Sequence, residues 1–315
     1  MTESADVISA RGLEVRYGDT IAVAGIDIQV AAGEVLGVIG PDGAGKTSTL
    51  RVLAGLHRAC AGVVTAFGEP IWKSRRRLHH RLGFLAQRFA LYGDLTVDEN
   101  IQFFSLLLGV RQWRERRLML LERVGLGAFH DRQADRLSGG MKQKLALVCS
   151  LLHSPEILIL DEPTTGVDPV TRREFWRLLA DLVADGLTLV VATPYLDEAE
   201  RCSRVVLMHR GRILADAHPA TLPALLPGRM IEISAGPRPL VLATLRLTPG
   251  VLDVRAVASL FHARCAEGGP TPTDLRTTLI AAGAKVEDAR EIPSNLEDTF
   301  LHLTRATAPA ATEAA

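Results

Sequence analysis

Cysteine is scarce in this chain, with four among 315 residues, and no two of them form a C-x-x-C pair. They lie far apart along the sequence, at Cys60, Cys149, Cys202 and Cys265. Scattered single cysteines do not provide the paired ligands of a zinc ribbon or the framework of a small disulfide-rich domain. We therefore expect neither cysteine-bound metal nor structural disulfides, and we expect a reducing compartment.

Net charge is also lacking, because 36 Lys and Arg residues balance 36 Asp and Glu residues. This balance excludes a general electrostatic attraction to nucleic acid or to an anionic membrane. One basic run, Lys73 to Arg77, is followed by His79 and His80. It comes just before an expected core strand, so we interpret it as the solvated start of a helix and expect no nucleic-acid partner.

Long hydrophobic runs are absent as well. The longest, such as Phe103 to Val110 and Leu187 to Ala192, are far shorter than the roughly 20 residues of a membrane-spanning helix. The first residues, Met1 to Asp6, are polar and acidic and do not resemble a secretory signal. We expect a cytoplasmic protein, and any membrane-spanning part of its function must come from another chain.

The sequence does contain a glycine-rich loop with the pattern G-x-x-x-x-G-K-T. The apolar strand expected at Glu34 to Ile39 leads into it, and a helix from Thr47 to Leu56 follows. In that setting the glycines let backbone N–H groups approach a phosphate chain, Lys46 bridges phosphates, and the hydroxyl of Thr47 binds Mg²⁺. By itself the loop predicts a site for a nucleotide and Mg²⁺ made by Gly40, Pro41, Asp42, Gly43, Ala44, Gly45, Lys46 and Thr47.

A second glycine pair, Gly139 and Gly140, follows Ser138 and opens another helix. A helix N-terminus of this kind also suits an anion, because its backbone N–H groups and dipole are positive there. One compact domain cannot easily direct both helix ends at one phosphate chain, whereas two chains arranged head to tail can. An apolar strand, Ile157 to Leu160, then ends in Asp161 and Glu162.

This order of motifs resembles the ATP-binding cassette (ABC) ATPases from about residue 7 to about residue 226. The resemblance implies that Glu162 is the general base for the attacking water, and that Asp161 binds Mg²⁺ through water. Gln87 would sense both Mg²⁺ and that water, while Lys46 would act on the β- and γ-phosphates.

The resemblance also implies contacts outside the phosphate loop. Tyr17 would stack on adenine, although ordinary packing is an equal reading of a single tyrosine. Ser48 would contact the α-phosphate. Ser138, Gly139 and Gly140 would contact the γ-phosphate bound by a partner chain, and Asp168 lies in the loop that would cross the dimer interface.

Three positions depart from the family pattern. Asp42 replaces the usual Asn, and we expect its carboxylate to point outward and cap the loop, because it would repel phosphates. Met141 replaces a frequent Gln. Pro194 occupies the place of a histidine that contacts the γ-phosphate, and proline offers neither a side-chain donor nor a backbone N–H. The fold tolerates this proline, but turnover at this chain's own site is in question.

Strands that are apolar on both faces alternate with helices, which predicts an α/β fold with a parallel sheet. We expect an antiparallel β subdomain near the N-terminus and an inserted helical subdomain at about 88–136. Pro219, Pro223 and Pro227 mark a boundary between a nucleotide-binding domain, 1–226, and a small α+β domain, 227–305. The order β-α-β-β-α-β in that domain is ferredoxin-like, and a disordered tail is expected at 306–315.

The segment Pro293 to Leu301 resembles the C-terminal box of daunorubicin-type export ATPases. The resemblance implies an ATP-hydrolysing subunit of an exporter, peripheral on the membrane, with a separate permease and a second ABC ATPase as partners. That second cassette is an identical chain or, given Pro194, one with an intact histidine. A largely non-hydrolytic ATP-binding clamp is the alternative. A third possibility is a soluble cassette protein that acts on ribosomes or DNA. Such proteins usually carry tandem cassettes or long coiled coils, and this chain shows neither pattern.

Overall fold

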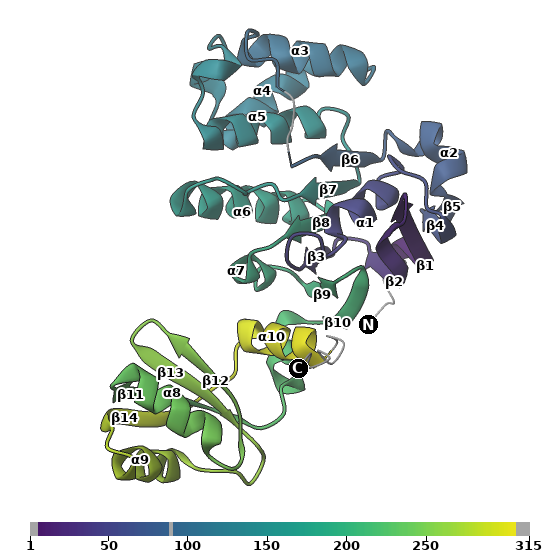
Figure 1. Cartoon of the computed structure of the whole chain (residues 1–315). Coiled ribbons are helices and arrows are strands. Elements are labelled where there is room, and N and C mark those ends of the chain that lie inside the picture. Colours follow the sequence, from purple (N-terminus) through teal and green to yellow (C-terminus); the bar gives the residue numbers. More distant parts are fainter. Residues whose placement is uncertain (1–5, 88–90, 307–315) are drawn as a thin grey trace. The chain divides into compact units, whose positions relative to one another are not determined.

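The computed structural model describes residues 6–87 and 91–306 and divides the chain into two compact units, Met1–Pro219 and Ala220–Ala315 (Figure 1). The division falls before the boundary expected after residue 226. A 3₁₀ helix, Pro219–Leu225, occupies this stretch, and Leu222 and Leu226 are buried. These apolar side chains place the prolines within folded structure and not in a linker. Within the described residues, no helix is long and apolar enough to span a membrane.

The first unit is built on a six-stranded sheet with the strand order β10-β9-β3-β8-β7-β6. Neighbouring strands are parallel except for β9 and β10. All residues of β3, β7 and β8 are buried, which is why these strands are continuous apolar runs in the sequence. The strands are β3 (Val35–Ile39), β6 (Leu82–Leu85), β7 (Ile157–Asp161), β8 (Thr188–Thr193), β9 (Arg204–His209) and β10 (Arg212–Ala217).

An antiparallel sheet of four strands, in the order β2-β1-β4-β5, forms the expected N-terminal β subdomain. Its two long strands are β1 (Asp6–Tyr17) and β2 (Thr20–Ala31), and Gly18 and Asp19 make the turn between them. The short strands are β4 (Ala61–Ala66) and β5 (Glu69–Pro70). Side chains of this sheet share one core with helix α1 (Lys46–Leu53) and the central sheet.

Helices α3, α4 and α5 gather as a separate layer in Figure 1, so a helical subdomain is present, but it extends beyond the expected end at about 136 because α5 belongs to it. Residues 88–90 at its expected start lie outside the described residues. Thr96 and Glu99 form a reciprocal capping box at the start of α3. The helices of the first unit are α2 (Ile71–Leu78), α3 (Val97–Leu107), α4 (Trp113–Val124), α5 (Gly139–Leu151), α6 (Pro169–Ala184) and α7 (Leu196–Ala199), with 3₁₀ turns at Gly127–Phe129 and Ala134–Arg136.

The second unit has the antiparallel strand order β12-β13-β11-β14, which is the arrangement of a ferredoxin-like fold and agrees with the expected order of elements. Apolar residues of the sheet and of α8 and α9 form its core. Its elements are β11 (Arg229–Gly236), α8 (Arg238–Leu247), β12 (Val251–Val257), β13 (Leu260–Cys265), α9 (Pro272–Ala281) and β14 (Lys285–Ile292).

A final helix, α10 (Leu296–Ala306), was not predicted from the sequence. Asn295 and Asp298 exchange hydrogen bonds at its start, with distances of 3.3 and 2.8 Å. The carboxylate of Asp298 also pairs with Arg255 of β12. The segment that resembles the export-ATPase box therefore caps this helix and attaches it to the sheet. Nine of the ten residues expected to form a disordered tail lie outside the described residues.

Two neighbouring residues on α9 test the core of the second unit. Leu279 is fully buried, whereas Ile280 is 54% exposed. Leu279→Ala should lower the free energy of unfolding by about 2–5 kcal/mol, because it removes buried methyl groups and leaves a cavity. Ile280→Ala should change it by no more than about 0.5 kcal/mol. Denaturant unfolding measures both, and equal effects would show that this face of α9 is not in the core.

Candidate nucleotide-binding site

The register of the parallel sheet brings the sequence motifs to one edge. Ile39 at the end of β3 pairs with Thr193 at the end of β8, and Asp161 at the end of β7 pairs with Ala192. Leu85 ends β6 beside Leu160. The loops that follow these strands carry the glycine motif, Glu162, Pro194 and Gln87. The carboxyl edge of a parallel sheet is where α/β proteins bind ligands.

The phosphate loop depends on the small size of its glycines. A Cβ atom on Gly40 would lie 2.3 Å from the carbonyl oxygen of Met208, and one on Gly45 would lie 2.4 Å from that of Ala22. Gly45 also has a φ of 103°, which favours glycine. Helix α1 follows without a side-chain cap and without an acidic residue in its first turn. Its first N–H groups have no partners within the helix, so this end suits a phosphate.

Lys46 is a buried cation at the centre of the site, with 4% of its surface exposed. Its Nζ donates to the carbonyl oxygens of Gly40 at 2.8 Å and Pro41 at 3.1 Å. The same nitrogen lies 3.2 Å from Oε1 of Glu162. The ammonium group therefore binds the loop on one side and the end of β7 on the other.

Asp161 and Thr47 meet directly. The Thr47 hydroxyl donates to Oδ1 of Asp161 at 2.9 Å, and Asp161 is 1% exposed. Burial raises the pKa of Asp161, and the negative charge of Glu162 adds to the rise, while the hydrogen bond from Thr47 opposes it. A hydroxyl and a carboxylate are hard oxygen ligands, so this pair fits Mg²⁺. The described residues hold no group of three or more His, Cys, Asp or Glu side chains that could bind a metal ion by themselves.

Glu162 accepts two further hydrogen bonds. Gln87 Nε2 donates to Oε2 of Glu162 at 2.9 Å, and the Thr165 hydroxyl donates to the same oxygen at 3.2 Å. Glu162 has a φ of 50°, a strained conformation of the kind that occurs at functional sites. Thr165 was not among the site residues predicted from the sequence. A hydroxyl residue three positions after the glutamate, in a turn, was the available signal.

Tyr17, predicted to stack on adenine, and Asp42, predicted to cap the phosphate loop, both lie at the surface. The Tyr17 ring stacks on His57, with centroids 5.3 Å apart and planes 30° apart, and Tyr17 is 44% exposed. Asp42 is exposed, as expected, but its carboxylate forms no hydrogen bond with the described residues, so the expected cap is absent. Ser48 is half-buried in the first turn of α1.

The second glycine motif lies elsewhere. Ser138 Oγ caps α5 by accepting from the N–H of Met141 at 3.3 Å. A Cβ on Gly140 would lie 2.2 Å from Thr171 of α6, so this glycine allows the two helix starts to approach. Asp168 caps α6 with two bonds of 3.0 Å, and hydrogen bonds from Thr171 lower the pKa of Asp168. The described residues show no hydrogen bond or ion pair between these groups and the phosphate loop.

Pro194 follows directly on β8 and is half-buried. The Thr193 hydroxyl accepts from the N–H of Tyr195 at 3.1 Å. The guanidinium of Arg172 stacks on the Tyr195 ring at 4.7 Å and pairs with Asp197 at 2.7 Å. The polar groups just after Pro194 thus take part in structural contacts.

The raised pKa of Asp161 leads to a stability prediction. At pH 7–8 its ionised carboxylate is buried beside another carboxylate, so Asp161→Asn should raise the melting temperature of the nucleotide-free protein. Each kcal/mol gained in the free energy of unfolding raises the melting temperature by about 2–4 °C for a domain of this size. The gain should shrink as the pH falls, because the wild-type carboxyl then becomes protonated as well. Asp131→Asn, at an exposed position, is the control for thermal unfolding. A lower melting temperature for Asp161→Asn would contradict the argument.

Comparisons with known proteins agree with this geometry. A family model described as "ABC transporter" matches residues 23–165. The daunorubicin resistance ATP-binding protein DrrA2 of Streptomyces coeruleorubidus is 36% identical, and the alignment covers 94% of each chain. The Nod factor export ATP-binding protein I of Burkholderia orbicola (strain AU 1054) is 38% identical over 94% of this chain and 96% of that protein.

The chain spans about half the length, 52%, of another relative, the probable multidrug ABC transporter ATP-binding protein YbhF of Escherichia coli (strain K12), which is 39% identical. Among solved structures, cbiO1 from Clostridium perfringens, part of the ABC transporter complex cbiONQ, is 27% identical with a TM-score of 0.63. That alignment covers 70% of this chain and 91% of cbiO1. The phosphate loop, the paired carboxylates and the relatives over nearly the whole length together show that the chain belongs to the ATP-binding proteins of the ABC transporter family.

Proposed function

We propose that this chain binds and hydrolyses ATP to drive export through a separate membrane-spanning permease. The observation that carries the proposal is the arrangement around Glu162. One oxygen of this carboxylate faces Lys46 at 3.2 Å, and the other accepts bonds from Gln87 and Thr165. A buried carboxylate oriented by two donors, next to a phosphate-binding lysine, suits a general base for an attacking water.

The same contacts suggest how ATP would engage the site. Lys46 would transfer its N–H donors from the carbonyls of Gly40 and Pro41 to phosphate oxygens. That transfer would release Oε1 of Glu162 to accept a proton from water, while Gln87 and Thr165 keep the carboxylate oriented. Mg²⁺ at Thr47 and Asp161 would neutralise part of the phosphate charge.

A second cassette would complete the site. In the described residues Ser138 to Gly140 make no polar contact with the phosphate loop, although the start of α5 presents an N-terminus suited to an anion. No atom lies within 4 Å of a Cβ built on Gly139, so that glycine is open to a partner. We propose a head-to-tail dimer in which these residues contact the γ-phosphate bound by the other chain.

The inserted helices would connect the cassette to the permease on the cytoplasmic face of the membrane. Phe103, Leu106 and Leu107 on α3 are 37%, 70% and 70% exposed, and exposed apolar side chains on neighbouring positions suit a protein interface. The printed names of two relatives, one for daunorubicin resistance and one for Nod factor export, support an export direction.

Pro194 supports an asymmetric pair of cassettes. A site built on this chain's phosphate loop would lack the histidine donor, so a partner chain with an intact histidine would contain the faster site. A largely non-hydrolytic clamp is the second candidate function, and Pro194 is the observation that favours it. Lys46, Gln87 and Glu162 are all present and in contact, which favours slow ATP hydrolysis at this site over a fully inactive site.

Lys46→Ala tests the nucleotide site. The variant should lose measurable Mg-ATP binding in an equilibrium titration, because the loop loses the only cation among the described residues that contacts its carbonyls. Lys142→Ala is the matched control, since Lys142 is a half-exposed lysine on α5. Circular dichroism should remain unchanged in both variants, and unchanged ATP affinity in Lys46→Ala would refute the assignment of this loop.

Pro194→His tests the role of the missing donor. Restoring a preorganised donor at a transition-state charge should raise single-turnover ATP hydrolysis by the purified chain, on the order of a hundredfold. Ser138→Arg tests the dimer, because in a mixed pair it should slow the partner's site more than this chain's own.

If wild-type protein already turns over as fast as Pro194→His, the missing histidine has no consequence and the asymmetric pair is excluded. If Ser138→Arg slows only this chain's own site, the head-to-tail arrangement is wrong.

A further inference from the structure

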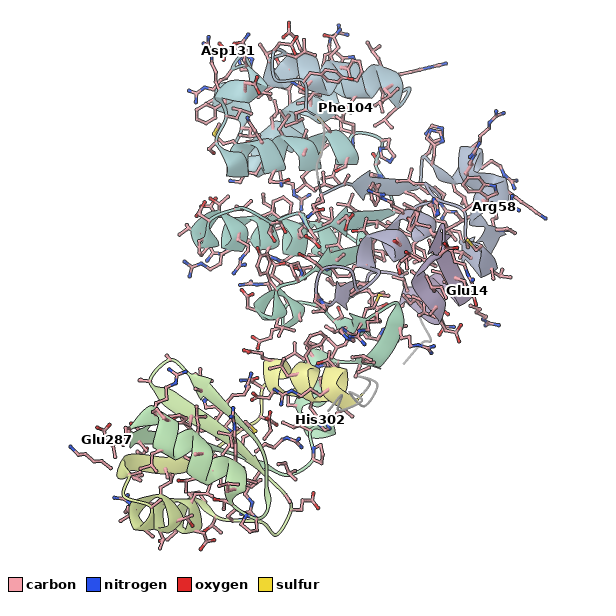
Figure 2. The ribbon with its side chains drawn as sticks, in the orientation of Figure 1. Glu14, Arg58, Phe104, Asp131, Glu287 and His302 are labelled. Carbon is pink, nitrogen blue, oxygen red and sulfur yellow. The ribbon has the colours of Figure 1, made fainter. Side chains whose placement is uncertain are left out.

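A cavity of about 240 Å³ lies in the second unit, between α10 and the face of the sheet opposite the α8 and α9 core. Its lining combines apolar side chains, among them Met230, Leu252 and Leu301, with arginine, histidine and aspartate side chains. Figure 2 labels one of these residues, His302, on α10. None of the residues predicted to bind the nucleotide lines this cavity.

The two acidic residues that line the cavity are already neutralised. Asp253 pairs with Arg305 at 2.6 Å, and Asp298 pairs with Arg255. Each pair joins a strand of the sheet to α10, so both carboxylates serve the attachment of this helix. Neither is free to repel an anion in the cavity.

Arg264 of β13 is different from the other two arginines. Among the described residues no carboxylate forms an ion pair with it, and its guanidinium makes one long hydrogen bond, 3.4 Å, to the carbonyl oxygen of Pro227. A guanidinium has five N–H donors in a planar fork, and this geometry matches a carboxylate. Most of the donors of Arg264 are therefore available to a ligand.

Two histidines add to this side of the cavity. The Nδ1 atom of His262 is buried and has no hydrogen-bond partner among the described residues, while its Nε2 lies 3.4 Å from Glu232. A buried polar atom without a partner is unusual in a folded protein and is expected to have a reason. Burial lowers the pKa of His302, as does the nearby Arg264, while Asp253 opposes them. His302 is therefore neutral at pH 7, and Arg264 supplies the positive charge.

We propose that this cavity binds a small organic carboxylate, with its carboxylate on Arg264 and its apolar part against Met230, Leu252 and Leu301. The size fits a compact ligand, because pockets for drug-sized molecules have about 300–1,000 Å³. The ligand would contact both the sheet and α10, so it would stabilise the second unit by mass action. This inference does not depend on the proposed transport function.

Benzoate is a suitable probe, with benzyl alcohol as its uncharged counterpart and inorganic phosphate as an anion without an apolar part. Isothermal titration of the full-length chain should show saturable benzoate binding, and benzoate should raise the melting temperature of the wild type. Arg264→Gln should weaken binding at least tenfold and abolish the thermal shift. Arg290→Gln should bind within twofold of wild type, since Arg290 pairs with Glu232 and does not line the cavity.

Arg264 is half-exposed, so Arg264→Gln should fold, and its circular dichroism and Mg-ATP affinity report whether it does. Loss of benzoate binding in this variant, with both controls intact, would support the site. The proposal is overturned if benzoate fails to bind wild-type protein, if Arg264→Gln binds it as well as wild type, or if benzyl alcohol or phosphate binds equally well.

Discussion

The buried ion pair between Lys46 and Glu162 is the interaction on which the nucleotide site depends. The two side chains are 4% and 7% exposed. Lys46 begins α1 after β3, Glu162 follows β7, and β8 lies between these two strands in the sheet. Taking two charges out of water is costly, and the pair is tolerable only because other groups complete its hydrogen bonding. The carbonyls of Gly40 and Pro41 serve the lysine, and Gln87 and Thr165 serve the glutamate. A phosphate that replaced Glu162 as the partner of Lys46 would meet an ammonium group that is already desolvated.

The same pair connects the site to the inserted helices. Gln87 follows β6 closely in the sequence and precedes helix α3, and its amide donates a hydrogen bond to Glu162. Any change in the position of the Glu162 carboxylate on ATP binding would therefore act on Gln87, which precedes the helical subdomain in the sequence. A two-state element biased by a ligand is the physical basis of such coupling. In this chain the element would be a single hydrogen bond between an amide and a carboxylate.

The sequence predicted those parts of the fold that local patterns determine. The buried strands, the phosphate loop and the β-α-β-β-α-β order all follow from apolar runs and glycine positions, and the structure agrees. Helix α10 was missed because its start depends on a cap between Asn295 and Asp298 and on Arg255, which is distant in the sequence. Thr165 was missed because its role depends on a contact with Glu162 that no periodicity reveals. The two compact units divide after Pro219, whereas the prolines suggested a boundary after residue 226, and proline positions alone do not reveal that Leu222 is buried.

Pro194 shows how fold and chemistry separate at one loop. The backbone N–H after it is satisfied by Thr193, and Arg172 fixes the following turn through Tyr195 and Asp197. Proline leaves no N–H of its own to satisfy, so its presence after β8 costs the fold little. The loop therefore holds its conformation with a proline, which has no hydrogen-bond donor, at this position. Asp168 caps α6 and Gly140 lies in the first turn of α5, so the residues that this chain would offer a second cassette lie outside the loop that contains Pro194. A cassette can thus keep its contribution to a partner's site while its own chemistry weakens.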